Sequence, residues 1–165
     1  MRQLPPHSNP SYGFSATPFG ECCIAFSDDG ICALTFPESR ESAYSDLDNR
    51  FPDVDFKLNE DKADRLVRQI FETGSRPVLN LIGTDFQLSI WDALQQVPAG
   101  KTTTYAQIAE VIGRPKAVRA VGTAIGANPI AYLIPCHRVI RTDGTLGGFR
   151  WGLECKKKML AYEAK

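Results

Sequence analysis

The first third of the chain alternates short apolar segments with turn-forming residues. Residues 12–36 have the composition of strands, with apolar segments at 21–26 and 31–36. The sequence Ser27-Asp28-Asp29-Gly30 lies between these two segments and favours a tight turn. This pattern predicts an antiparallel hairpin within a small sheet.

A helix and a connector follow the predicted sheet. Apolar residues recur at helical spacing between Asn59, which is a suitable N-cap, and Thr73. Residues 75–82 include a proline and read as a connector. The sequence therefore predicts two domains, over residues 1–83 and 84–165.

The second half of the chain predicts helices joined by short turns. Apolar residues at helical spacing indicate three helices, over residues 84–97, 104–113 and 115–125. The first two open with capping boxes, in which Thr84 pairs with Gln87 and Thr104 pairs with Gln107. Pro115, at a first helical position, opens the third. Because only a short turn separates the second helix from the third, the pair predicts a helix-turn-helix.

Three further elements complete the predicted fold. They are a strand over residues 131–134, a hairpin with Asp143-Gly144 at its tip that resembles the wing of a winged helix, and a last helix over residues 154–164. The predicted fold class is α+β: a small N-terminal antiparallel-sheet domain is followed by a mostly helical domain that resembles a winged helix-turn-helix.

The composition is that of an ordinary globular protein, with 43% hydrophobic and 23% charged residues in a chain of 165. Its five cysteines show no Cys-x-x-Cys spacing, which disfavours a zinc site and a disulfide framework. With only two histidines, a metal centre is not expected. Residues 1–6 lack the apolar core of a signal peptide, and no segment has the length and apolarity of a membrane span. We therefore expect a cytoplasmic protein that does not contact membranes.

Charge is unevenly distributed, although the net charge is zero. Residues 1–83 hold 8 Lys and Arg against 13 Asp and Glu (−5), whereas residues 84–165 hold 11 against 6 (+5). A basic C-terminal half suits contact with phosphates, and an acidic N-terminal half would stay away from them. The asymmetry favours nucleic-acid binding by the second domain.

The segment Ile134-Pro135-Cys136-His137-Arg138-Val139 places a thiol next to an imidazole. Only the thiolate is a good nucleophile, and a neighbouring imidazole commonly lowers a thiol pKa from its ordinary ~8.5. We therefore expect a lowered pKa for Cys136 if it is the nucleophile. An isolated Cys-His pair is more often structural, because buried free cysteines are usually inert. In addition, His137 cannot face Cys136 along a straight strand, so the chain would have to turn there.

Several stretches of the second half resemble the methylated-DNA–protein-cysteine methyltransferases, which repair O6-alkylguanine. These stretches are residues 104–109, residues 115–122, Asn128-Pro129 and the Pro-Cys-His-Arg-Val motif at residues 135–139. They follow one another in the same order and at the same spacing as in that family. Residues 143–152 are similar to the Ada branch of that family, and Thr17-Pro18-Phe19-Gly20 resembles its first strand. The resemblance is dense from Thr84 onward and looser before it.

This resemblance implies direct-reversal DNA repair without a cofactor. The alkyl group of O6-alkylguanine, and that of O4-methylthymine, would move to Cys136 in a single irreversible turnover. Because the damaged base is stacked in the duplex, its nucleotide must first be flipped out. The implied partner is double-stranded DNA, bound by a monomer in the minor groove without regard to sequence. The N-terminal domain would be ribonuclease H-like; no four-cysteine zinc domain precedes it, so we expect no transcriptional role.

The resemblance also implies roles for individual residues. Tyr105 would help to rotate the nucleotide and would hydrogen-bond the purine, and Arg119 would fill the vacated stack. His137 would be linked to Cys136 through a water molecule and oriented by Glu163. The remaining implied positions support the active-site turn, border the base pocket or approach the DNA: Asn128, Val139, Phe149, Arg150, Ala120, Gly122, Thr123 and Gly126.

The predicted second helix of the helix-turn-helix carries mostly small side chains. Arg119 is the only charged residue between Ala117 and Ala127. A helix that reads base sequence usually presents several Asn, Gln, Arg or Lys residues to the major groove. This helix instead favours close approach to a groove without base readout, and tight packing inside a core is the alternative.

Two other functions remain open from the sequence. A lesion sensor or regulator would bind DNA without chemistry, but the family's non-catalytic members replace the active cysteine, commonly with tryptophan, and this chain keeps Cys136. A cysteine hydrolase would need an oxyanion hole and an acyl substrate, and the sequence proposes neither.

Overall fold

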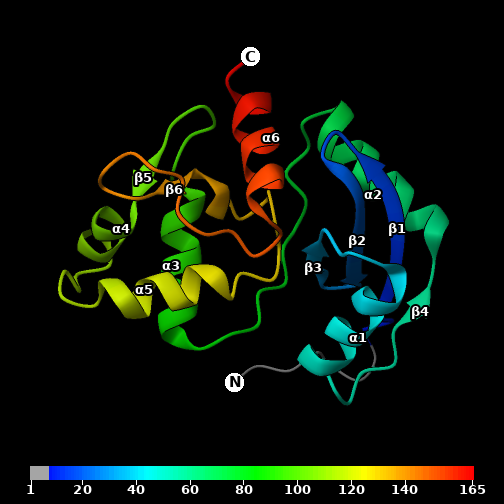
Figure 1. The fold of residues 1–165 in the computed structure, drawn as a ribbon. Coiled ribbons are helices and arrows are strands. Elements are labelled where there is room, and N and C mark those ends of the chain that lie inside the picture. Colours follow the sequence, from blue (N-terminus) through cyan, green and yellow to red (C-terminus); the bar gives the residue numbers. More distant parts are fainter. Residues whose placement is uncertain (1–7) are drawn as a thin grey trace. The chain divides into compact units, whose positions relative to one another are not determined.

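The computed structural model describes residues 8–165 and divides the chain into two compact units between Ile82 and Gly83. Strands and helices pack together in both units (Figure 1). The predicted α+β class is confirmed.

A four-stranded sheet forms the centre of the N-terminal unit, in the order β3-β2-β1-β4. Its strands are β1 (Ser11–Thr17), β2 (Gly20–Ser27), β3 (Gly30–Thr35) and β4 (Lys57–Leu58). The predicted hairpin is confirmed, because β2 pairs with β3 in antiparallel register around the turn. However, β4 runs parallel to β1, so the predicted antiparallel sheet is mixed at this edge.

Two helices, α1 (Arg40–Arg50) and α2 (Glu60–Glu72), cover opposite faces of this sheet. Since strand side chains alternate between faces, Phe14 and Cys23 join one apolar cluster with Leu47 of α1. The opposite face packs against α2 at Gly13, where a Cβ atom would lie 2.5 Å from Cβ of Ala63. Glycine is therefore required there for close helix–sheet contact.

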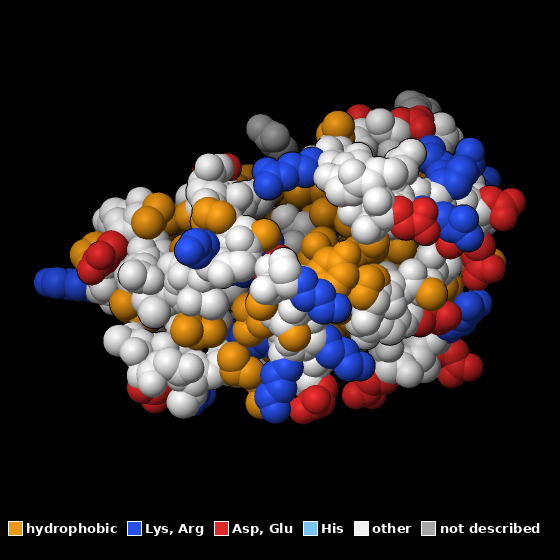
Figure 2. Space-filling model, turned by 90° about the horizontal axis from the view of Figure 1, so that it is seen from above, with side chains coloured by type: hydrophobic (Ala, Val, Ile, Leu, Met, Phe, Trp, Pro, Cys, Tyr) orange, Lys and Arg blue, Asp and Glu red, His pale blue; other side chains and the backbone are white. Residues whose placement is uncertain are grey.

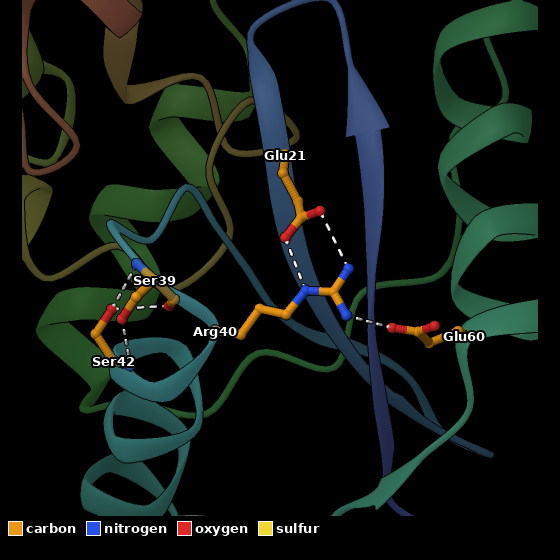
Figure 3. A network of polar contacts seen from close by, with 5 residues as sticks. All are labelled: Glu21, Ser39, Arg40, Ser42 and Glu60. Atoms are coloured by element: carbon orange, nitrogen blue, oxygen red, sulfur yellow. Dashed lines mark hydrogen bonds and ion pairs between the residues drawn. The ribbon is translucent and has the colours of Figure 1, made fainter.

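The hydrophobic pattern did not predict α1, because its sequence is largely polar. The helix begins with a capping box between Ser39 and Ser42. Arg40 binds Glu21 of β2 and Glu60 of α2 through N–O distances of 3.1 and 3.0 Å (Figure 3). These contacts are solvent-exposed, so they fix the position of α1 more than they stabilise the fold.

The C-terminal unit contains four α-helices, a 3₁₀ turn and a pair of short strands. In chain order they are α3 (Asp85–Gln95), β5 (Thr103–Thr104), α4 (Tyr105–Val111), α5 (Val118–Gly126), η1 (Cys136–Arg138), β6 (Val139–Ile140) and α6 (Leu153–Glu163). Both predicted capping boxes are confirmed, at Thr84 and at Thr104. The buried indole of Trp91 on α3 donates to the carbonyl of Ala124 on α5 at 3.0 Å. This bond joins α3 to α5, the second helix of the helix-turn-helix.

The predicted start of α5 at Pro115 is wrong. The amide of Ala117 donates to the carbonyl of Arg114 at 2.9 Å and closes a turn that contains the proline, so the helix begins only at Val118. Pro115 therefore belongs to the turn of the helix-turn-helix.

The predicted strand over residues 131–134 is also wrong, and the segment is a compact turn. Its amides bond within the segment, from Leu133 to the carbonyl of Ala131 at 2.8 Å and from Ile134 to that of Ile130 at 3.1 Å. Tyr132 has a φ of +69°, which a strand cannot contain. The apolar run reflects burial of the turn rather than sheet pairing.

The predicted wing is present only as its tip. The amide of Arg141 donates to the carbonyl of Thr145 at 2.9 Å around Asp143-Gly144, but no hairpin strands continue from this turn. Instead, β6 pairs in parallel with β5. The segment that follows β6 therefore needs other contacts to hold its shape.

The surface reflects the uneven charge of the sequence. On the face drawn in Figure 2, acidic side chains lie mainly on the N-terminal unit. Within residues 8–165, no helix combines the length and the apolarity that crossing a lipid bilayer requires.

Candidate active site

Cys136 lies in a 3₁₀ turn at the end of the buried 130–134 segment and is only 5% exposed. The fully buried side chain of Asn128 fixes this turn through three hydrogen bonds. Its Nδ2 donates to the carbonyl of Ile134 at 2.9 Å and to Sγ of Cys136 at 3.2 Å, while its Oδ1 accepts from the amide of Ile130 at 2.9 Å. One amide side chain thus sets both the backbone turn and the position of the thiol.

The protonation state of Cys136 differs from the sequence expectation. Burial raises the pKa of its thiol to about 11, although the Asn128 hydrogen bond and the positive charges of Lys156 and Arg150 act in the opposite direction. The expectation of a lowered pKa is therefore wrong for the resting protein, because desolvation of the thiolate outweighs these favourable contacts. At neutral pH, Cys136 is a neutral thiol.

The 3₁₀ turn supplies the change of direction that His137 requires. Its imidazole is fully buried, and Nε2 lies 2.9 Å from Oε1 of Glu163, at ion-pair distance but without the alignment of a good hydrogen bond. Burial lowers the pKa of His137, against the opposing effect of Glu163, so the ring is neutral. Because a carboxylate only accepts, Nε2 carries the proton and Nδ1 keeps its lone pair. Among the described residues, Nδ1 has no hydrogen-bond partner.

Glu163 is shared between His137 and Arg138. Its side chain is 3% exposed, and Arg138 donates to it through Nε at 3.0 Å and through Nη2 at 2.5 Å. Burial raises the pKa of this carboxyl group, but the contacts with His137 and Arg138 outweigh burial and hold it at about 2. Arg138 also donates to the carbonyl of Val97 at 2.5 Å, which fixes the position of the guanidinium group. The carboxylate of Glu163 is therefore ionised and held by a fixed partner.

Tyr105 begins α4 and its ring passes close to Gly122 of α5. A Cβ atom on Gly122 would lie 3.7 Å from the ring, and one on Gly147 would lie 3.2 Å from the hydroxyl oxygen. Burial, followed by the negative charge that Cys136 can carry, raises the pKa of Tyr105. The phenol is therefore protonated and lies within electrostatic range of the thiol.

The other predicted pocket residues lie around the same turn. Val139 is fully buried, and Phe149 packs edge-on against Trp151 with ring centroids 5.4 Å apart. Arg150 donates to the carbonyl of Asn128 at 3.3 Å, which connects the segment after β6 to the turn that holds Cys136.

The predicted DNA-contacting residues of α5 form an outward-facing surface. Arg119, Ala120, Thr123 and Gly126 are exposed, whereas Gly122 is half-buried beside Tyr105. Part of α5 also borders an open groove, whose lining includes Phe86 of α3 and the cations Lys116 and Arg119. The structure therefore brings Cys136, Asn128, His137, Glu163 and Tyr105 together and leaves this helix surface outside the cluster.

Three residues of the site had no assigned role in the sequence interpretation. Arg138 lies within the motif at residues 135–139, but its partner Glu163 is on the last helix. Only folding brings the two together, so the sequence did not reveal the contact. Tyr132 stacks on the imidazole of His137 with centroids 5.8 Å apart and planes 6° from parallel, from a turn mistaken for a strand. Lys156 is completely buried, although three consecutive lysines normally indicate a solvated helix face.

The C-terminal unit matches the model of a known protein family. Residues 85–165 match the family model for the DNA-binding domain of 6-O-methylguanine DNA methyltransferase. The chain is 39% identical over 160 residues to the bifunctional transcriptional activator/DNA repair enzyme Ada of Escherichia coli, covering 93% of this chain but only 45% of that protein. The chain thus spans about half the length of this relative.

Two further proteins match over nearly their whole length. A methylated-DNA–protein-cysteine methyltransferase of Methanosarcina acetivorans is 35% identical over 157 residues, covering 92% of this chain and 97% of that protein. The crystal structure of Mycobacterium tuberculosis OGT in complex with DNA has a TM-score of 0.76 and 32% identity, over 93% of this chain and 92% of that chain. Similarity of this extent, together with the cysteine-centred cluster, shows that the chain belongs to the methylated-DNA–protein-cysteine methyltransferase family.

Proposed function

We propose that this chain repairs DNA by direct reversal, moving the alkyl group of O6-alkylguanine, and that of O4-methylthymine, to Sγ of Cys136. One observation carries the proposal: a buried thiol bonded to Asn128 lies within electrostatic range of Tyr105 and directly precedes His137, which is paired with Glu163. The DNA bound by the M. tuberculosis neighbour and the DNA-repair name of the E. coli relative support it.

In this proposal the exposed surface of α5 enters the minor groove of double-stranded DNA independently of sequence. Its small side chains allow close approach, and Arg119 fills the stack that the flipped nucleotide leaves. Flipping is required because the thiol is only 5% exposed and the alkyl carbon would otherwise remain within the duplex. The protein acts as a monomer in the cytoplasm.

The reaction begins with movement of the thiol proton. A water molecule carries this proton from Sγ of Cys136 to Nδ1 of His137, and Glu163 stabilises the resulting imidazolium. The thiolate then attacks the alkyl carbon in line, so that the C–S bond forms as the C–O6 bond breaks.

The departing guanine keeps the electron pair of the broken bond and needs a proton. The hydroxyl of Tyr105, which is protonated at neutral pH, can supply it, and the proton that His137 holds as an imidazolium then returns the tyrosinate to its neutral form. The product is a thioether, which no neighbouring group can hydrolyse. Each molecule therefore acts once.

The mass of the peptide that contains Cys136 tests this function. After incubation with a duplex that contains O6-methylguanine, the peptide should gain one methyl group. Cys136→Ala should still bind the duplex but transfer nothing. Binding by the wild-type protein without a mass increase would indicate a lesion sensor, and methyl transfer by Cys136→Ala would remove Cys136 from the mechanism.

The dependence of transfer rate on pH tests the role of His137. In the wild-type protein the rate should vary little between about pH 7 and pH 8.5, because the thiol proton moves within the protein. His137→Gln can react only through thiolate in equilibrium with solvent. Since the thiol pKa is about 11, the rate of this variant should rise about tenfold per pH unit over the same range.

Glu163→Gln should change the profile in the same direction, and Glu154→Gln is the matched control because Glu154 is exposed on the same helix. Profiles of wild type and His137→Gln that coincide would exclude His137 as the base.

A comparison of two substrates tests the flipping role of Arg119. Unstacking costs a few kcal/mol and each 1.4 kcal/mol is about tenfold, so Arg119→Ala should slow transfer from duplex DNA by roughly ten- to a thousand-fold. Reaction with the free base O6-benzylguanine needs no flipping and should be nearly unchanged.

Lys116→Ala is the control for a simple phosphate contact. It should weaken binding in a manner that low salt corrects, with a normal rate once DNA saturates the protein. If Arg119→Ala behaves like Lys116→Ala, Arg119 is a phosphate contact. Equal losses on the two substrates would instead assign it to the fold of the active site.

A further inference from the structure

Tyr132 stacks on the proposed base, His137, although it lies outside both neighbouring stretches that resemble the family, Asn128-Pro129 and residues 135–139. Its ring and the imidazole are 6° from parallel, with centroids 5.8 Å apart. This stacked arrangement is one that aromatic pairs prefer. Tyr162 of α6 packs edge-on against Tyr132, with centroids 6.4 Å apart and planes at 72°. The imidazole therefore faces a ring that a second ring holds in place.

The backbone conformation of Tyr132 is unusual for a residue of this size. Its φ of +69° lies in the left-handed region, and among residues 8–165 the only other non-glycine residue with a positive φ is Asn9. Glycine and asparagine adopt this conformation more readily than a bulky side chain does. A strained residue persists only where the surrounding structure determines it. The aromatic side chain is thus present here against the preference of the backbone.

The imidazole of His137 is fully buried, so water cannot stabilise a charge on it. In the proposed reaction this ring takes up the thiol proton and becomes an imidazolium. Burial and the positive charges of Arg138 and Lys156 oppose that charge, whereas Glu163 favours it. Because the same carboxylate also binds Arg138, its negative charge is already partly compensated. The imidazolium therefore needs a further favourable contact.

The ring of Tyr132 can supply this contact. An aromatic face attracts a cation that lies within about 6 Å of its centroid, and the attraction is largest where water is excluded. Burial, followed by the negative charge of Glu163, raises the pKa of Tyr132, so the phenol is neutral and acts through its ring. The cation–π attraction is absent while the imidazole is neutral and appears when it becomes charged. The contact therefore favours proton uptake by His137.

We propose that Tyr132 is a positioning residue for alkyl transfer, whose ring holds the imidazole of His137 towards Glu163 and stabilises the positive charge that the imidazole gains. This inference rests on the proposed function. It predicts that the aromatic ring of Tyr132 is required and that its hydroxyl group is not. It also predicts that Tyr132 acts only through His137.

Single-turnover methyl transfer from a saturating duplex that contains O6-methylguanine tests the proposal. Tyr132→Leu keeps an apolar side chain without a π face and should lower the rate constant by roughly 5- to 30-fold, the size of a cation–π contact in a desolvated site. Tyr132→Phe keeps the ring and should react at the wild-type rate. Tyr44→Leu makes the same exchange at an exposed position of α1 and should have no effect.

A double-mutant cycle with His137→Gln separates this role from support of the fold. Without the imidazole, Tyr132 has no charge to stabilise, so adding Tyr132→Leu to His137→Gln should cause no further loss of rate. A purely structural tyrosine predicts the same fold-loss in both backgrounds. The cycle is measured at about pH 8.5, where His137→Gln forms more thiolate than at neutral pH.

Thermal unfolding is followed in parallel, and Tyr132→Asn, which suits the positive φ, replaces Tyr132→Leu if that variant is unstable. A wild-type rate in a folded variant without the ring would overturn the proposal. Equal losses in the two backgrounds, a loss in Tyr132→Phe as large as that in Tyr132→Leu, or a similar loss in Tyr44→Leu would also overturn it. So would failure of both ringless variants to fold, which would indicate a purely structural tyrosine.

The wild-type reaction distinguishes failure of this inference from failure of the proposed function. If the wild-type protein transfers no methyl group to Cys136, the proposed function fails and this inference fails with it. If the wild-type protein transfers the methyl group and a folded variant without the ring does so equally fast, only the role of Tyr132 is wrong.

Discussion

A buried carboxylate, that of Glu163, is the group on which the arrangement of the site depends. A charge at 3% exposure is tolerated only with close compensation, and Arg138 and His137 provide it from the turn that also carries Cys136. The last helix is thereby fixed to the active-site turn. The same contacts hold the carboxylate ionised while burial keeps the imidazole neutral, so His137 retains a lone pair at Nδ1, as the proposed role of a base requires.

Burial has a second consequence, because it suppresses the thiolate of Cys136. Under the proposed single-turnover function, a nucleophile that is inert towards most electrophiles is an advantage. Asn128, Lys156 and Arg150 favour the thiolate without overcoming desolvation. In the proposed mechanism, the thiol therefore ionises when its proton has an internal acceptor. Burial raises the pKa of each of the three cysteines of the N-terminal sheet to about 12, although backbone hydrogen bonds at Cys22 and the positive charge of Arg50 near Cys32 act in the opposite direction.

Local signals in the sequence predicted much of the fold. The capping boxes at Thr84 and Thr104 and the cap at Asn59 identified helix starts correctly, since each depends on residues three positions apart. Helix α1 was missed because its buried positions are too few to produce a periodic pattern. Residues 131–134 were mistaken for a strand because apolar content reports burial and not backbone conformation. The positive φ of Tyr132, which shows that the segment is a turn, is visible only in the structure. Lys156 and the raised thiol pKa depend on groups brought together by folding, so no local pattern contains them.

The most direct test of this account is a pH titration of the Cys136 thiolate in the resting protein. The ultraviolet absorbance of the wild-type protein minus that of Cys136→Ala isolates this thiolate, because the other cysteines cancel. We expect no thiolate signal from Cys136 up to about pH 9, with its onset approaching the pKa of about 11. A Cys136 thiolate present at pH 7, with a pKa below the ordinary ~8.5, would contradict the account, since the nucleophile would then be ionised before any proton reached His137.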